Sequence, residues 1–401
     1  MTEFLTDRRT LLGGAAALAG LSALPKLALA QGAPIRIGTL TPLTGAGGPY
    51  GPVMVKAVKA VIDEVNAAGG VLGRKVELVS EDDQTSPEAG VRAARKLIDV
   101  DKVSAILGTW ASSVTTAVAP LCWESKTFLC TTSGADSITA LPHQGYLIRT
   151  QPTTTLQGRK FGEFAIAQGA KRVFFLSPQT PFAKSQFDNI TEAVKKAGGE
   201  TASLIYDDKK PAYRTEIDEV LRFKPDAIVF GGYTPDTAVM LKDLYRADFK
   251  GVKIAFGYSV NQKLIESVPA EVVDKTFMIS PSPAEGSKAY EKLVKLIGVA
   301  SPDPYTTQIY DHINLVLMAI AIAGDATGTA IKDNIRKVSQ APGGAKIDSA
   351  VDGLKAIAAK QAVDYDGASG PCDFTEIGDI SDSKFRYEQV QSGKIALVKI
   401  A

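Results

Sequence analysis

The sequence Ile35-Arg36-Ile37-Gly38-Thr39-Leu40 is a short β-rich run, and the residues around it decide the fold class. After a loop rich in glycine and proline, apolar residues recur at helical spacing from Val53 to Val65. Gly69-Gly70 ends that helix, as glycine does at helix C-termini, and Val76-Glu77-Leu78-Val79 is the next β-rich run. A strand, a helix and a strand in succession predict a βαβ unit with parallel strands.

The same alternation continues along the chain and restarts after Gln151. Helices are predicted at about 88–98, at about 114–123 and directly after Thr131–Asp136, and further strands at 105–107, 127–129, 173–176, 202–205, 227–230 and 253–256. A chain of 401 residues is also too long for one hydrophobic core. We therefore expect an α/β fold with two doubly wound lobes, each built on a mostly parallel sheet.

Residues 1–30 have the features of an export signal. Arg8-Arg9 precedes an apolar run from Leu11 to Leu24, and Ala28-Leu29-Ala30 matches the small-residue pattern that a signal peptidase accepts. The run is shorter than the ~20 residues that span a bilayer, so we expect no permanent membrane anchor. The paired arginines favour twin-arginine export, and the general secretory route is the alternative. Either route predicts a periplasmic location.

Charge and motifs exclude several classes of function. The 45 Lys and Arg balance 44 Asp and Glu, and no basic run of five occurs, so nucleic acid is not an expected partner. The loop Gly45–Gly51 does not fit the spacing of a dinucleotide-binding motif, and no phosphate loop or GxSxG serine is present. His143 and His312 are the only histidines, so no metal site, catalytic triad or cofactor is predicted. Glu81-Asp82-Asp83 is interpreted as a set of strand-end carboxylates.

The three cysteines leave one question open. Cys122 and Cys130 lie eight residues apart, and in an exported chain they form either a disulfide or two buried thiols. Cys372 is interpreted as a packing residue.

The loops that follow the predicted strands carry the candidate binding residues, because ligands of open α/β sheets lie at the carboxyl ends of the strands. In the loops before Gln151 the candidates are hydroxyl-bearing residues and Trp110, and in the loops after Gln151 they are single aromatic residues. The candidates are Trp110, Ser112, Ser113, Thr132 and Ser133, with Phe182, Tyr233 and Tyr258. Ser112 or Ser113 at a helix N-terminus suits a carboxylate, although simple N-capping is an alternative role. A cleft between the lobes would hold a small, partly apolar molecule.

These features occur together with a series of short motifs in a fixed order. They include Pro42-Leu43-Thr44-Gly45, Asn66 to Arg74, Glu81-Asp82-Asp83-Gln84, Arg149 with Pro152, Gly231-Gly232-Tyr233, Gly370-Pro371 and Val390 to Lys394. In these motifs the chain resembles the leucine/isoleucine/valine-binding proteins, which are type I periplasmic binding proteins. The resemblance implies two lobes joined by a hinge of three crossing strands, with lobe 1 at 34–150 and 282–379 and lobe 2 at 153–280 and 382–401. It also implies solute capture without catalysis and, as partners, an ABC permease and its ATPases; a ligand sensor of the same fold is the alternative.

The resemblance further implies roles for single residues. Ser112 matches the serine that binds the ligand carboxylate, and Thr132 and Ser133 match the small residues whose backbone helps to hold the ligand. Tyr50, Phe182 and Tyr233 match the flanking aromatic residues. Two positions depart from the family pattern: a threonine is replaced by Gly134, and the glutamate that pairs with the ligand ammonium is replaced by Ser259. Because an unpaired buried ammonium is costly, we expect a carboxylate ligand without an amino group, placed against Trp110 and Tyr258.

Overall fold

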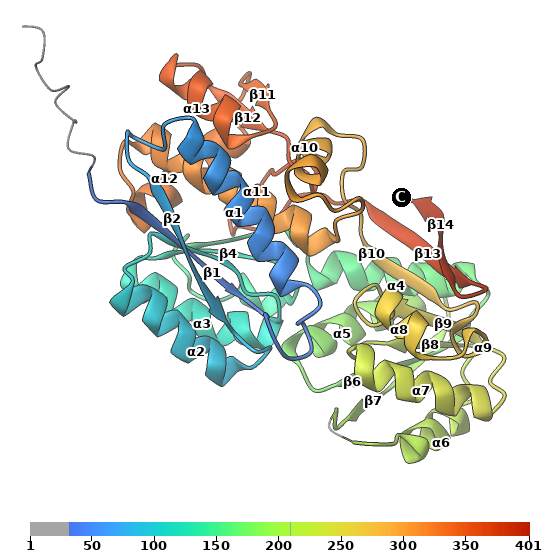
Figure 1. The fold of residues 1–401 in the computed structure, drawn as a ribbon. Coiled ribbons are helices and arrows are strands. Elements are labelled where there is room, and N and C mark those ends of the chain that lie inside the picture. Colours follow the sequence, from blue (N-terminus) through green and yellow to red (C-terminus); the bar gives the residue numbers. More distant parts are fainter. Residues whose placement is uncertain (1–31, 209) are drawn as a thin grey trace, which may run out of the picture.

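The computed structural model describes residues 32–208 and 210–401, so the predicted export signal at 1–30 lies outside the described residues. The chain forms an α/β molecule with two lobes, each of which has a mostly parallel sheet flanked by helices (Figure 1). We call the lobe with the five-stranded sheet lobe 1 and the lobe with the seven-stranded sheet lobe 2. The predicted fold class is confirmed.

Lobe 1 is built on five parallel strands in the order β2-β1-β3-β4-β5. The strands are β1 (Ile35–Thr41), β2 (Val76–Asp82), β3 (Ala105–Gly108), β4 (Phe128–Thr131) and β5 (Leu147–Arg149). The connecting helices are α1 (Gly51–Ala67), α2 (Pro87–Arg95), the π-helix η1 (Lys96–Val100), α3 (Ser112–Ser125) and the 3-10 turn η2 (Asp136–Ile138). Every residue of β3 and β4 is buried, as expected for central strands that are covered by helices on both faces.

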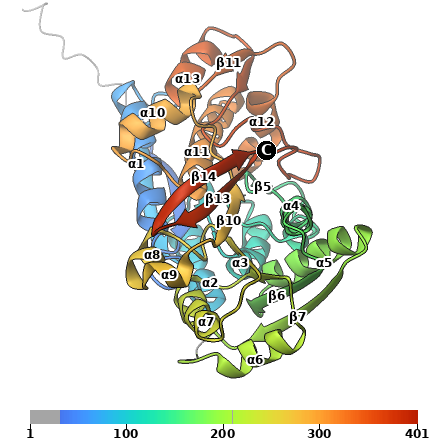
Figure 2. The same ribbon diagram turned by 90° about the vertical axis from the view of Figure 1, so that its right-hand side faces the viewer.

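Lobe 2 has the strand order β7-β6-β8-β9-β10, and the antiparallel strands β13 and β14 complete its sheet next to β10. The strands are β6 (Arg172–Pro178), β7 (Glu200–Tyr206), β8 (Ala227–Phe230), β9 (Val252–Phe256), β10 (Phe277–Pro281), β13 (Phe385–Gln391) and β14 (Lys394–Ile400). The helices are α4 (Thr154–Ala167), α5 (Pro181–Lys196), α6 (Arg214–Arg222), α7 (Thr234–Arg246), α8 (Gln262–Ser267) and α9 (Ala270–Val273). Figure 2 shows the C-terminal hairpin beside β10.

A late segment of the chain returns to complete lobe 1. It contains α10 (Lys288–Ile297), α11 (Pro304–Ala323), α12 (Gly328–Ser339), β11 (Ala345–Ile347), α13 (Ala350–Ala358) and β12 (Val363–Tyr365). Sixteen of the 20 residues of α11 are buried, and its side chains share one core with those of α1. Figure 1 shows these orange and red helices beside the blue α1.

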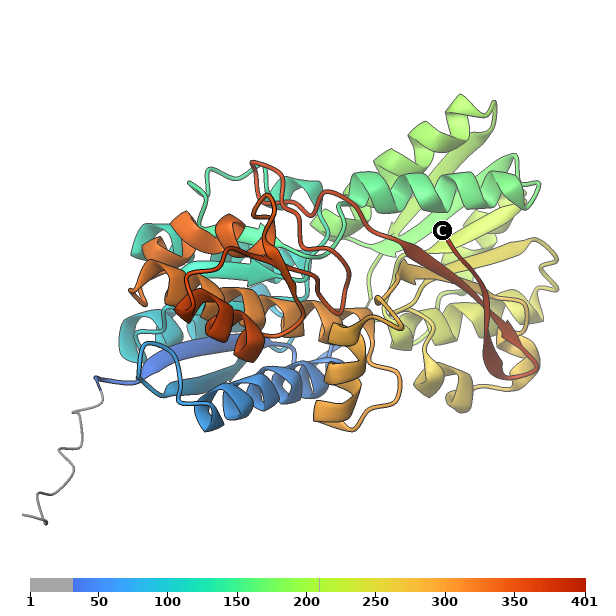
Figure 3. The ribbon, with the colours of Figure 1, turned by 90° about the horizontal axis from the view of Figure 1, so that it is seen from above.

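The chain passes between the sheets three times, after β5, after β10 and before β13 (Figure 3). Two of these passages are tied together by a parallel bridge between Arg149 and Asp379. The passage after β10 is joined to the passage before β13 by a hydrogen bond of 2.8 Å from the Ser282 N–H to the Lys384 carbonyl. The lobe boundaries at 34–150 with 282–379 and 153–280 with 382–401 stay a prediction, and the strand membership of the two sheets agrees with them.

Two predicted helices differ from those in the structure. The helix expected at 88–98 ends as α2 at Arg95 and continues as a π-helix, in which the Asp101 N–H donates to the Lys96 carbonyl at 3.0 Å. The helix expected after Thr131–Asp136 is only the single turn η2. Pro142 follows closely and disfavours helical backbone at the residue before it.

The cysteine question is answered by the fold, because Cys122, Cys130 and Cys372 are all free and buried. Burial raises the pKa of the Cys122 thiol to about 12. Across the described residues, no single helix is long and apolar enough to cross a membrane. Only α11 and α12 taken together pass that test, and they are bent by 104° at their junction.

Candidate functional site

The two lobes share one strand order, and this order places their binding loops opposite each other. In each lobe the first crossover places the second strand on one side of the first strand, and the second crossover places the third strand on its other side. The strand order therefore reverses between β1 and β3 in lobe 1 and between β6 and β8 in lobe 2. Ligands of doubly wound sheets bind outside the carboxyl ends of the strands at such a switch point. The loops after β3, β4, β6, β8 and β9 meet there around a pocket of about 490 Å³ of space between atoms.

Seven of the nine candidate residues line this pocket. The full lining is Trp110, Ala111, Ser112, Ser113, Thr132, Gly134, Gln151, Pro178, Thr180, Phe182, Gly231, Tyr233, Tyr258 and Tyr305. The two candidates outside the lining are Tyr50 and Ser133.

The N-terminus of α3 opens into the pocket without a side-chain cap. Ala111 is the N-cap residue and has no side chain that could accept from the helix, so Ser112 and Ser113 are its first two helical residues. The alternative role of these serines, simple N-capping of the helix, is therefore wrong. The Ser112 hydroxyl accepts from the Ala135 N–H at 3.2 Å, which leaves its own O–H free to donate. This end of the helix combines free N–H groups, hydroxyls and the positive end of the helix dipole.

The loop after β4 divides its two hydroxyls between different tasks. Thr132 lines the pocket, and its hydroxyl is buried without a partner. The Ser133 hydroxyl instead donates within lobe 1 to the carbonyl of Trp110 at 2.9 Å and approaches the Thr115 hydroxyl. The Ser133 side chain therefore supports the pocket wall from behind, whereas the hydroxyl of Thr132, a lining residue, has no hydrogen-bond partner among the described residues.

Trp110 is the centre of an aromatic cluster that joins the lobes. Its ring centroid lies 5.5 Å from that of Tyr50 and 5.6 Å from that of Tyr305, both in lobe 1. It lies 5.7 Å from the rings of Tyr233 and Tyr258 in lobe 2. Tyr50 therefore stands behind Trp110 rather than in the lining, although its hydroxyl also meets the Asn261 amide of lobe 2 at 3.5 Å.

The pocket is electrically neutral. Within the described part of the chain, its lining contains no Asp, Glu, Lys or Arg. Burial raises the pKa of Tyr233, Tyr258 and Tyr305 above the usual value, so their hydroxyls stay protonated. The carboxylate of Asp303 is close to the cluster but is occupied as the N-cap of α11, where it accepts from the N–H groups of Tyr305 and Thr306 at 2.9 and 3.1 Å.

Other residues with possible chemistry are explained by structure. His312 is fully buried in α11, its Nε2 lies 2.8 Å from the Thr150 hydroxyl, and burial lowers its pKa to about 3. Asp82 accepts from the N–H groups of Leu43 and Thr44, so it holds the loop after β1. In the residues that the structure describes, no group of three His, Cys, Asp or Glu side chains gathers as a metal site requires.

Residues 34–379 match the sequence profile of the family described as periplasmic binding protein. The chain belongs to this family. The same span contains every residue of the pocket lining, from Trp110 to Tyr305, so the match covers the whole site.

Known members share the length and the fold of this periplasmic binding protein. The Leu/Ile/Val-binding protein BraC3 of Rhizobium johnstonii is 24% identical over 375 residues, which cover 90% of this chain and 93% of that protein. The leucine-binding protein LivK of Thermotoga maritima superposes with a TM-score of 0.79 at 23% identity, over 91% of this chain and 98% of that one. A solute-binding protein of an ABC transporter from R. palustris, solved in complex with benzoate, has a TM-score of 0.74 at 18% identity, over 92% and 96% of the two chains.

The two departures from the family pattern have a structural basis in this binding protein. A Cβ atom at Gly134 would lie 2.7 Å from the Gln157 amide nitrogen and 3.0 Å from the Phe182 ring, so glycine lets both side chains approach the loop. Ser259 is fully buried and donates its hydroxyl to the Gly232 carbonyl, and it is not part of the pocket lining. The neighbouring Tyr258 faces the pocket instead.

Two of the lining residues that were not candidates lie outside the strand-end loops that the sequence singled out in this binding protein. Tyr305 is the second residue of α11 and comes from the segment that returns to lobe 1, and Gln151 lies on the first passage between the lobes. The Gln151 amide oxygen accepts from the Gln308 amide nitrogen at 2.7 Å, so its own NH₂ group is left for the pocket. Tyr305 lies in a helix and does not follow a strand, and Gln151 follows β5, a three-residue strand that the sequence pattern did not predict.

Proposed function

We propose that this protein captures a small aromatic carboxylate without an ammonium group and delivers it to an ABC importer. The observation that carries the proposal is a neutral, aromatic-walled pocket into which an uncapped helix N-terminus opens. Family membership supports capture of a solute, and the pocket chemistry supports the choice of solute.

The carboxylate would bind at the start of α3. An anion gains there from free backbone N–H groups and from the helix dipole, without a cationic side chain. Ser112 has an O–H to donate, and the unpartnered hydroxyl of Thr132 supplies another donor close by in the lining. A bound carboxylate would therefore satisfy polar groups that the protein leaves open.

The rest of the ligand would contact aromatic rings. Trp110, Phe182, Tyr233, Tyr258 and Tyr305 supply most of the apolar lining. Offset and edge-on packing of a ring ligand against such side chains is favourable. An α-amino acid fits less well, because its ammonium would be buried without an anionic partner. The benzoate complex of a structural neighbour agrees with this choice of ligand, although that likeness concerns the fold.

The same proposal includes delivery of the ligand to an importer, a periplasmic location of the protein, and binding of the ligand without catalysis. The pattern at residues 1–30 supports export to the periplasm. The neighbour solved with benzoate is itself described as the solute-binding protein of an ABC transporter. Because the lining has hydroxyls and aromatic rings but no ionisable acid or base near neutral pH, binding and release are the chemistry it supports.

The direct test is a thermal-shift screen of protein that has been refolded to remove carried-over ligand. The ligands are benzoate, 4-hydroxybenzoate, leucine and valine. A ligand at about a hundred times its dissociation constant adds roughly 2.7 kcal/mol and raises the midpoint by several degrees. We expect a shift with the benzoates and none with leucine; a shift with leucine and none with the benzoates would overturn the ligand assignment.

A further inference from the structure

Asp136 reaches from the pocket loop of lobe 1 into lobe 2. It lies two residues after Gly134 of the pocket lining, at the start of η2. Its Oδ2 accepts from the Ser185 hydroxyl at 2.8 Å and from the Asn189 amide at 3.3 Å, and both donors belong to α5 of lobe 2. Asp136 itself is not part of the pocket lining.

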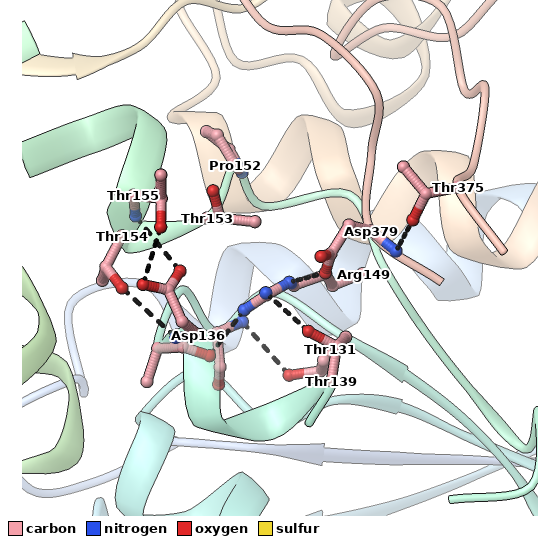
Figure 4. Close-up of polar contacts among 12 residues, drawn as sticks. Thr131, Asp136, Thr139, Arg149, Pro152, Thr153, Thr154, Thr155, Thr375 and Asp379 are labelled. Carbon is pink, nitrogen blue, oxygen red and sulfur yellow. Dashed lines mark hydrogen bonds and ion pairs between the residues drawn. The ribbon is translucent and has the colours of Figure 1, made fainter. Parts of the chain in front are cut away.

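The same carboxylate caps a helix of the other lobe. Its Oδ1 accepts from the Thr155 N–H at 3.1 Å, and its Oδ2 accepts from the Thr155 hydroxyl at 2.9 Å (Figure 4). The side chain of Thr153 caps the next free position of α4, the Leu156 N–H, at 3.2 Å. The N-terminus of α4 is thus completed by a carboxylate that comes from lobe 1, which is the favourable sign of charge at that end of a helix.

The buried side chain of Arg149 donates hydrogen bonds to the loop residues on both sides of Asp136. Arg149 donates from Nη1 to the Ala135 carbonyl at 2.7 Å and from Nη2 to the Thr139 hydroxyl at 2.9 Å. Its Nε donates to Asp379 at 2.5 Å, which ties the loop to another passage between the lobes (Figure 4). The Asp136 carboxylate is therefore presented to lobe 2 from a rigid support.

The negative charge of Asp136 is stabilised by hydrogen bonds from neutral donors and not by a cation. In residues 32–208 and 210–401, none of the ion pairs includes Asp136. Burial raises the pKa of this carboxyl, but hydrogen bonds from Ser185, Thr155 and Thr154 outweigh it and hold the pKa below the usual value. An ionised acceptor makes stronger hydrogen bonds than a neutral one.

We propose that Asp136 is the latch of the closed cleft: its hydrogen bonds to Ser185 and Asn189 form as the lobes close, and they slow ligand release. Asp136 is a positioning residue in this role, since it touches the opposite lobe and not the pocket. The part that concerns ligand release rests on the proposed function, whereas the part that concerns closure does not. Loss of the latch changes the rate of opening, so it acts on the dissociation rate and leaves the encounter with ligand unchanged.

The kinetic test uses benzoate as the probe and the tryptophan fluorescence of the cleft as the signal. We expect Asp136→Ala to raise the dissociation rate about tenfold, with an association rate within about threefold of the wild type. The matched control is Asp188→Ala, an exposed carboxylate on α5 whose ion pair, among the described residues, is with Lys184 of its own helix. In a double-mutant cycle, Ser185→Ala combined with Asp136→Ala should cost less than the two separate effects together. Full additivity, or an unchanged dissociation rate in Asp136→Ala, would contradict the latch.

A second test needs no ligand. Spin labels at Lys56→Cys and Lys263→Cys, two exposed sites beside the Tyr50–Asn261 contact, report the distance across the cleft, and the buried native cysteines do not compete for label. Asp136→Ala should move the ligand-free distance distribution towards the open form, and Asp188→Ala should not. If benzoate fails to bind the wild type while this shift is present, the ligand assignment is wrong and the latch stands. If benzoate binds and no shift occurs, the latch is wrong and the assignment stands.

Discussion

At the scale of the residue, the pKa values of two neighbouring carboxyl groups at the end of β2, Asp82 and Asp83, are shifted in opposite directions. Asp82 is held below its usual pKa because hydrogen bonds from Thr44, Gln84 and Leu43 outweigh the effect of burial. Burial raises the pKa of Asp83 to about 7, and only the Thr85 N–H, at 2.7 Å, offsets it. The Asp83 Oδ2 has no partner. As pH rises, ionisation of Asp82 therefore favours the folded state, whereas ionisation of Asp83 disfavours it.

Asp83→Asn should stabilise the protein at neutral and alkaline pH. Because the folded pKa lies above the unfolded value, the folded state binds the proton more tightly, and stability falls as pH rises from about 4 to about 7. The asparagine removes this fall, so its advantage should grow by on the order of 2 kcal/mol between pH 5 and pH 8. Denaturant unfolding at both pH values measures it. Asp82→Asn is the control and should be destabilising at both; an advantage of Asp83→Asn that shrinks with pH would refute the assignment.

A second residue-scale prediction concerns Gly134. Gly134→Ala places a methyl group against the Phe182 ring and the Gln157 amide, at 3.0 and 2.7 Å. Overpacking of this kind costs about 1–3 kcal/mol, and the displaced ring should weaken benzoate binding about tenfold. Calorimetric titration and thermal unfolding measure the two effects. Adding Phe182→Leu should recover part of the stability; no recovery would show that the ring is not what the methyl group displaces.

At the scale of the element, α3 has an N-terminus left open where most helices of this chain are closed. Eight described helices have a side-chain cap: Ser86 on α2, Thr153 on α4, Thr180 on α5, Asn261 on α8, Ser287 on α10, Asp303 on α11, Thr327 on α12 and Ser349 on α13. Ala111 has an extended backbone that suits a cap, with φ −77° and ψ 129°, but it lacks the side chain. The absence of a cap keeps N–H groups available to a ligand.

Ala111→Ser should therefore raise stability and lower affinity together. The new hydroxyl would accept from the first turn of α3 and add about 1 kcal/mol, and it would occupy the donors that the carboxylate needs. We expect the ligand-free midpoint to rise and the benzoate affinity to fall about tenfold. Ser349→Ala on α13, far from the pocket, should lower the midpoint and leave affinity unchanged. Unchanged affinity in Ala111→Ser would remove α3 from the binding site.

At the scale of the whole molecule, the aromatic cluster is where the two cores meet. Trp110 belongs to the core of lobe 1, and Phe182 and Tyr258 pack against the cores of both lobes. Opening of the cleft would separate these rings and expose them to water. The exposure of Trp110 is thus expected to report the state of the whole molecule.

The chain has two tryptophans, so Trp123→Phe leaves Trp110 as the sole reporter. We expect acrylamide to quench its fluorescence less efficiently once benzoate is added, because closure buries the ring. The reciprocal variant, Trp110→Phe, keeps the half-buried Trp123, whose quenching should not respond to ligand. Equal quenching with and without bound benzoate would mean that binding does not close the lobes around Trp110.

The alternation of strands and helices, and with it the class of fold, could be predicted from the sequence. This information is local: β propensity, helical spacing and glycine stops act within a few residues. Because a ligand site lies at the carboxyl ends of parallel strands, the same local pattern also indicated Trp110, Ser112, Thr132, Tyr233 and Tyr258, which the structure brings into one pocket.

Which residues line the pocket, and which are used elsewhere, depends on how distant segments pack. Tyr305 and Gln151 come from segments far apart in sequence that pack together through the buried α11. Ser133 and Thr132 are neighbours with equivalent hydroxyls, yet the Ser133 hydroxyl is used inside lobe 1 and the Thr132 hydroxyl has no partner among the described residues. The contact of Asp136 with α5 likewise exists only when both lobes are folded and facing each other. These choices depend on packing between distant segments, which local propensity does not encode.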